Sequence, residues 1–195
     1  MEWTTVLEII ATISGLLCVY LQTEEKILAW PFGIISVSLL AIIFYHNRLF
    51  SDLILHGILL ILNIYGWHYW SNRNSIVIEK IPIQLFQTKD WMVWPLVIIA
   101  VTPVWGYLMN HYFRAEMAYL DAFTTVGSLI AQYLLAKKYL QNWTLWIIVD
   151  IVAIGVYLYK GIYIVAFLFF AYLLLCIKGY LDWKKELQLN NTITT

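Results

Sequence analysis

The stretch Asn142-Trp143-Thr144-Leu145-Trp146-Ile147-Ile148-Val149-Asp150 places a carboxylate inside a long apolar segment. Trp143, Trp146 and Asp150 are spaced i, i+3 and i+7, so in a helix they share one face. The helical rise puts Asp150 about 10 Å below Trp143 along the axis. A carboxylate at that depth in a bilayer costs roughly 2.5–3.5 kcal/mol. The stretch therefore predicts a membrane-spanning helix whose charge is compensated by donors, by a proton or by a cationic ligand.

The composition of the whole chain is that of a polytopic membrane protein. Of its 195 residues, 62% are hydrophobic and only 12% are charged, whereas a soluble domain has about 25% charged residues. The formal net charge of +0 gives no reason to expect nucleic-acid binding. The two cysteines lie in apolar runs, and the four histidines lack metal-ligand spacing. Since no nucleophile or metal set is visible, we expect neither an enzyme nor a bound cofactor.

Seven segments are long and apolar enough to cross the hydrocarbon as helices. They are residues 3–21, 27–46, 50–70, 91–109, 117–136, 143–160 and 161–181. A seven-helix retinal protein would need a lysine in the middle of the last span, whereas Lys178 lies near its end. That class of protein is therefore disfavoured.

The basic residues of the loops predict the orientation of the chain. Alternate loops carry three basic residues on one side (Arg48, Arg114, Lys160) and nine on the other (Lys26, Arg73, Lys80, Lys89, Lys137, Lys138, Lys178, Lys184, Lys185). Because basic loops remain in the cytoplasm, we expect the N-terminus outside and the C-terminus inside.

The first three spans repeat in the last three at an offset of 113 residues. Equivalent pairs at this offset include Glu8 and Asp121, Trp30 and Trp143, Gly66 and Gly179, and Trp70 and Trp183. We infer a duplicated three-helix unit at 1–70 and 117–185, joined by 71–116 with a linker helix at 91–109 and followed by a polar tail at 186–195. The odd linker helix gives both units the same orientation. Such 3+1+3 parallel repeats are typical of transporters that bind their substrate between the repeats.

Polar and aromatic residues within the spans form the candidate site. In the fifth span, Asp121, Thr125 and Gln132 belong to one polar stripe, and Asn63 shares a face with Trp67 in the third. Two structural interpretations stay open. The Thr and Ser side chains can instead form hydrogen bonds between helices, and the Trp side chains can instead lie at the membrane interface. Stacked rings above a carboxylate nevertheless suit a flat cationic aromatic ligand. The candidate substrate-binding residues are Trp143, Trp146, Asp150, Gln132, Asn63, Trp30, Thr125 and Trp67.

Two motifs resemble the PnuC family of bacterial vitamin transporters. Asn63-Ile64-Tyr65-Gly66-Trp67-His68-Tyr69-Trp70 matches the family's NIYGWxxW pattern, and the stretch from Lys138 to Trp146 matches its K-Y-x-x-x-W-x-x-W segment. The resemblance covers nearly the whole chain and also includes Trp30-Pro31-Phe32-Gly33. It implies an all-α membrane fold similar to a full-length SWEET sugar transporter, assembled as a homotrimer in the bacterial inner membrane.

The resemblance also implies an activity, which is uptake of nicotinamide riboside by facilitated diffusion, with a cytosolic kinase trapping the product. One position departs from that pattern. Family members associated with the riboside carry W-x-x-W-x-x-x-N, whereas Asp150 makes the pattern here W-x-x-W-x-x-x-D, similar to relatives proposed to move thiamine. Both vitamins carry a cationic aromatic ring, so thiamine uptake stays an alternative to riboside uptake.

Overall fold

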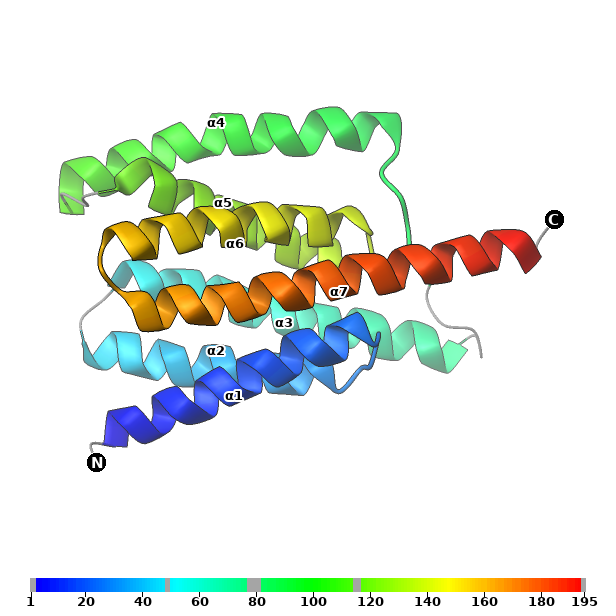
Figure 1. Ribbon diagram of the computed structural model, residues 1–195, viewed down its shortest axis with the longest axis horizontal. Coiled ribbons are helices and arrows are strands. Elements are labelled where there is room, and N and C mark those ends of the chain that lie inside the picture. The colour runs from blue at the N-terminus through cyan, green and yellow to red at the C-terminus, as the bar shows by residue number, and fades with distance from the viewer. Residues whose placement is uncertain (1–2, 48–49, 77–81, 114–116, 194–195) are drawn as a thin grey trace.

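The computed structural model describes residues 3–47, 50–76, 82–113 and 117–193, which form seven helices. They are α1 (Trp3–Thr23), α2 (Ala29–His46), α3 (Phe50–Ile76), α4 (Thr88–Phe113), α5 (Ala118–Ala136), α6 (Gln141–Tyr159) and α7 (Tyr163–Ile193). The helices run alternately up and down one long axis, and the two termini lie at opposite ends of the bundle (Figure 1). Arg48, Lys80 and Arg114, which entered the orientation argument, lie outside the described residues.

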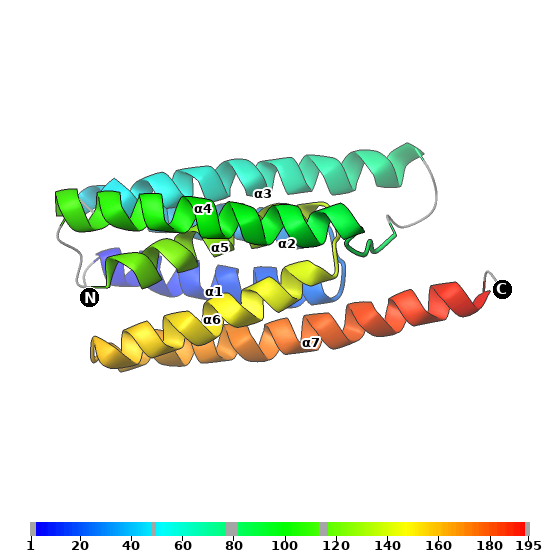
Figure 2. The same cartoon turned by 90° about the horizontal axis from the view of Figure 1, so that it is seen from above.

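Each predicted span corresponds to one helix, but several helices continue past the predicted ends. The third continues to Ile76, the fourth begins at Thr88, and the last continues through Ile193 into the segment predicted as a polar tail. The spans were delimited where hydropathy falls, whereas backbone hydrogen bonding within a helix does not stop at the edge of the hydrocarbon. The protruding end of α7 is visible beyond the other helices (Figure 2).

Six helices form a closed ring, and α4 lies outside it. Neighbouring contacts run from α1 to α2, α3, α5, α6 and α7, and the contact between α7 and α1 closes the ring. Among the described residues, α4 packs on α5. The two units therefore meet along two equivalent seams, α3 with α5 and α7 with α1. This arrangement is the predicted 3+1+3 parallel repeat, with the twofold relation along the bundle axis.

A tryptophan–glycine contact recurs at equivalent places in the two units. A Cβ added at Gly66 would overlap the Trp30 ring, and one added at Gly179 would lie 2.7 Å from the Trp143 ring. Trp30 meets Trp70 edge-on with ring centroids 5.2 Å apart, and Trp143 meets Trp183 edge-on at 5.4 Å. The two glycines thus let large rings approach the helix backbone, which brings α2 close to α3 and α6 close to α7.

Hydrogen bonds from the same tryptophan cluster join the two units. The Trp70 Nε1–H donates to the Ala136 carbonyl over 3.0 Å, and the Trp183 Nε1–H donates to the Gln22 carbonyl over 3.3 Å. Each bond satisfies a carbonyl near the end of a helix of the other unit, where intrahelical partners run out. The cluster therefore fixes the packing within each unit and between the units at one end of the ring.

The central polar helix is α5. Six helices are long and apolar enough to cross a membrane, and α5, which carries the stripe of Asp121, Thr125 and Gln132, is the one below that level within the described residues. Its buried residues include Val126, Gln132 and Leu134, because α3, α4 and α6 all pack around it. A helix enclosed by three others needs less lipid-facing apolar surface than its neighbours.

We predict that Gly66→Ala destabilises the protein whereas Gly57→Ala in the same helix does not. A Cβ at Gly66 displaces the Trp30 ring, but a Cβ at Gly57 meets nothing within 4 Å. Overpacking costs about 1–3 kcal/mol, while alanine in an open helical position gains up to about 1 kcal/mol over glycine. Thermal unfolding in detergent measures both, and equal melting temperatures for the two variants would contradict the tryptophan–glycine contact.

Candidate functional site

Asp150 is the buried charge around which the candidate site is built. It lies on α6 with 2% of its surface exposed. The Cys176 thiol of α7 donates to its Oδ2 over 3.5 Å, and no lysine or arginine of the described ranges forms an ion pair with it. A thiol is a weak donor, so it compensates the negative charge poorly. The negative charge of Asp150 thus has no positive partner in the described part of the chain, and a cationic ligand would provide one.

Asn63 and Gln132 meet across the seam between α3 and α5. The Gln132 Nε2 donates to Asn63 Oδ1 over 3.4 Å, and both side chains are buried. Asn63 also donates to the Leu59 carbonyl within its own helix. Its carboxamide oxygen lies against Gly33 of α2, where a Cβ would collide with it. Two of the predicted site residues, one from each unit, are therefore in direct contact.

The tryptophans of the site belong to the cluster that joins the two units. Trp30 and Trp143 are 0% and 1% exposed, and Trp146 is partly buried against the same group of side chains. Because Trp30 and Trp143 are buried within the bundle, their rings do not face lipid as the rings of an interface belt do. The Nε1–H groups of both lack a protein acceptor among the described residues. Since buried donors rarely stay unsatisfied, these two equivalent groups can donate to a ligand.

Cys176 belongs to the tryptophan cluster and also contacts Asp150, so it connects the two parts of the site. Cys176 was not among the predicted site residues, because the sequence places it in an apolar run. The repeat carried the missing signal, because the offset of 113 maps Asn63 onto Cys176. Tyr172, one turn earlier on α7, was also missed. A Cβ at Gly15 would lie 2.5 Å from the Tyr172 hydroxyl, which therefore reaches from the second unit to the first.

Two predicted residues lie apart from these contacts. The Thr125 hydroxyl donates to the Asp121 carbonyl of its own helix over 2.8 Å. Trp67 is 43% exposed, whereas Asn63, Gly66 and Trp70 of the same helix are buried. Trp67 follows Gly66 directly and is thus turned away from the buried face of α3. The structure brings the other six predicted residues into two groups, the amide pair and the tryptophan cluster with Asp150.

Comparison with known proteins decides the family. The profile of the nicotinamide mononucleotide transporter family matches residues 5–185. The chain belongs to this family. Its membership and its apolar helices make it a multi-pass membrane transport protein rather than an enzyme.

Relatives and a solved structure agree with the family. The nicotinamide riboside transporter PnuC of Escherichia coli is 26% identical, over 91% of this chain and 84% of its own. That of Haemophilus influenzae is 28% identical over 95% and 82%. The riboflavin/roseoflavin transporter RibM of Streptomyces davaonensis is 22% identical over 90% and 83%.

The crystal structure of a vitamin B3 transporter PnuC aligns with a TM-score of 0.76 at 24% identity, covering 94% of this chain and 83% of that one. The predicted PnuC resemblance and all-helical membrane fold are thus confirmed.

The contact between Asn63 and Gln132 predicts coupling between the two positions. Gln132→Leu leaves the Asn63 carboxamide oxygen buried without a donor, which costs about 1–3 kcal/mol of stability. The double variant Asn63→Leu/Gln132→Leu should therefore lose less than the sum of the single losses. Thermal unfolding of the four proteins measures the coupling. Thr125→Val on the same helix serves as the control, because its hydroxyl bonds within α5; if it coupled to Asn63 equally, the amide contact would be refuted.

Proposed function

We propose that this chain carries nicotinamide riboside across the bacterial inner membrane by facilitated diffusion. The observation that carries the cationic aromatic ligand of this proposal is the buried Asp150 carboxylate, whose hydrogen-bond donor is the Cys176 thiol. A cationic aromatic ring placed beside it would supply the missing positive charge. Several relatives bear the name of nicotinamide riboside transporters, which supports the riboside as that ligand.

Each group of the candidate site has a role in this proposal. Trp146, and Trp143 above it, would stack on the ring and offer their faces to its charge. The free indole N–H groups of Trp30 and Trp143 would donate to ribose or carboxamide oxygens. Asn63 and Gln132 would bond the remaining polar groups of the ligand. Because Asp150 is 2% exposed, the ligand reaches it only after the surrounding helices move.

Thiamine is the second candidate substrate, and Asp150 itself favours it. The carboxylate replaces the asparagine associated with riboside transport, and the aminopyrimidine of thiamine would give it a donor as well as a nearby positive charge. Riboflavin, the ligand named for the RibM relative, is flat but uncharged, so it tests whether the pocket requires a cation.

Transport would proceed by rocking of the two three-helix units about the site. Their two seams lie on opposite sides of the ring, so a tilt about the site opens one end while it closes the other. The predicted orientation places the N-terminus outside and the C-terminus in the cytoplasm, where a kinase would trap the vitamin.

The proposed homotrimer has support from the position of α4. This helix lies outside the ring and exposes a row of large apolar side chains, among them Trp91, Met92, Leu96 and Ile99. Such a surface would face lipid or a second copy of the chain.

Calorimetric titration of the purified protein tests the substrate and the site together. We expect nicotinamide riboside to bind more tightly than thiamine, and riboflavin to bind least. Asp150→Asn and Trp146→Ala should each weaken binding of the cationic vitamins about tenfold, which corresponds to about 1.4 kcal/mol. Trp67→Ala is the matched control for the loss of an indole, and we expect this variant to bind the vitamins as tightly as the parent protein does.

Three outcomes would contradict parts of this proposal. Binding of thiamine alone would overturn the order of substrates. Unchanged affinity in both Asp150→Asn and Trp146→Ala would remove the site. A loss in Trp146→Ala but none in Asp150→Asn would leave the stacking role and refute the charge role.

A further inference from the structure

One ion pair joins two residues that are equivalent in the repeat. The Lys138 Nζ lies 2.5 Å from Glu25 Oε2, and the separation of the two residues along the chain is 113. This separation equals the repeat offset. Under a twofold relation, a residue can touch its own equivalent only close to the axis. The pair of Glu25 and Lys138 therefore lies on the axis that relates the two units.

The two residues occupy the same local conformation in equivalent turns. Glu25, between α1 and α2, has φ 53°, and Lys138, between α5 and α6, has φ 59°. Each turn is closed by the next residue, through Lys26 N to Leu21 O and Tyr139 N to Leu134 O, at 2.9 and 3.0 Å. Non-glycine residues in this left-handed region are uncommon. Both turns hold it and thereby aim the two side chains at each other.

The ion pair is enclosed by protein. The side chains of Lys138 and Glu25 are 4% and 3% exposed, and the Lys138 ammonium lies 4.6 Å from the centre of the Trp70 ring. The segment before α4 covers the same turn, because Gln84 N donates to Lys138 O and Leu140 N donates to Gln84 O. Because water is excluded around Glu25 and Lys138, their charges interact more strongly than they would at the surface.

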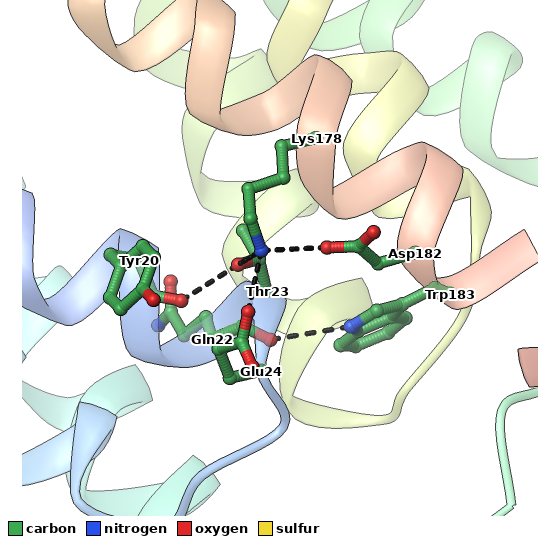
Figure 3. A network of polar contacts seen from close by, with 7 residues as sticks. All are labelled: Tyr20, Gln22, Thr23, Glu24, Lys178, Asp182 and Trp183. Atoms are coloured by element: carbon green, nitrogen blue, oxygen red, sulfur yellow. Dashed lines mark hydrogen bonds and ion pairs between the residues drawn. The ribbon is translucent and has the colours of Figure 1, made fainter.

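Further contacts between the units surround the pair at the same end of the bundle. Lys178 of α7 contacts Glu24 at 2.6 Å and the Thr23 hydroxyl at 3.0 Å, next to the bond from Trp183 to Gln22 (Figure 3). The side chains of Lys178 and Glu24 are 38% and 36% exposed, so water weakens their ion pair. Towards the other end, the described ion pair of Lys160 and Asp121 lies within the second unit. In the described part of the chain, the ion pairs between units are therefore confined to one end.

We propose that the axial pair of Glu25 and Lys138 is a latch that holds this end of the transporter closed and separates in each transport cycle. The inference rests on the proposed transport function, and it assigns a role to residues outside the substrate site. On a twofold axis, two units that rock apart separate equivalent residues directly. A contact between them therefore exists only while this end of the protein is closed.

The chemistry of the pair suits a contact that must also open. Burial raises the pKa of Glu25, and Glu186 raises it further, whereas the nearby Lys138 ammonium acts in the opposite sense. The loss of hydration thus offsets part of the attraction between the charges. Such a pair aligns the two units without locking them permanently. Had both units kept the same charged residue here, the like charges would repel in the closed state.

The twofold relation yields a specific test, which is exchange of the two charges. In the double variant Glu25→Lys/Lys138→Glu, the lysine stands at position 25. By the twofold relation it would lie next to Trp183, the repeat equivalent of Trp70, and beside Glu186. The single variants Glu25→Gln and Lys138→Met remove one charge each. If the axial contact is the latch, the double exchange should restore what each single substitution loses.

Opening of the latch can be read from the alkylation rate of Cys176, which is only 3% exposed. Cys18→Ala removes the other thiol, and alanine already occupies its equivalent position, Ala131. Membrane vesicles are treated with a charged, membrane-impermeant maleimide on the face that carries the latch. Both single variants should label about tenfold faster than the parent, which is the rate change given by a tenfold larger open population.

The charge-exchanged double variant should label at close to the parental rate, as should Lys160→Met, the matched lysine control at the other end. Unchanged labelling in both single variants would overturn the latch. So would double-variant labelling as fast as in the singles, or equal acceleration from both faces, which marks general loosening. The assay contains no vitamin. A result that overturns the latch therefore does not affect the conclusion on vitamin binding, and a failure of vitamin binding does not affect the test of the latch.

Discussion

A tryptophan ring pressed against a glycine holds α2 to α3, and the same contact 113 residues later holds α6 to α7. The glycine removes the side chain that would keep the helices apart, and the ring fills the space with buried apolar area. Because Trp70 and Trp183 pack edge-on against these rings and donate across the seams, the geometry within each unit sets the distance between the units. The positions of the amide pair, of Asp150 and of the axial ion pair all follow from this cluster.

The proposed functional residues are departures from an otherwise repeated frame. Asp150 corresponds to Val37, Cys176 to Asn63, and Lys138 to Glu25. In each case the backbone environment is kept while the chemistry differs. A strictly symmetric ring would present the same groups twice, whereas an asymmetric vitamin with one charged ring needs a charge on one side and amides on the other. The duplication supplies the scaffold, and in the proposed site its divergence would supply the recognition.

The bilayer explains why so few charges appear in the chain. A buried ion in lipid requires a partner, and three lysines near the ends of the helices have one. Lys138 pairs with Glu25, Lys178 with Glu24 and Asp182, and Lys160 with Asp121. Asp150 differs, since the group that donates a hydrogen bond to it is the thiol of Cys176. This contrast separates charges that maintain the architecture from the one suited to a ligand.

The sequence by itself determined the seven helices, their duplication and the face shared by Trp146 and Asp150, because hydropathy, helical period and a fixed offset are properties of the linear chain. It also placed Asn63 and Gln132 in one candidate site.

The tertiary structure decided the rest. It turned Trp67 outward, buried Trp30 and Trp143, and brought Cys176 to Asp150 and Tyr172 to Gly15. It also brought Glu25 against Lys138. The alignment marks these two as equivalent but gives no distance between them. Contacts across the seams depend on how the two units close into a ring, and that closure arises from packing between residues that are 66 to 161 positions apart.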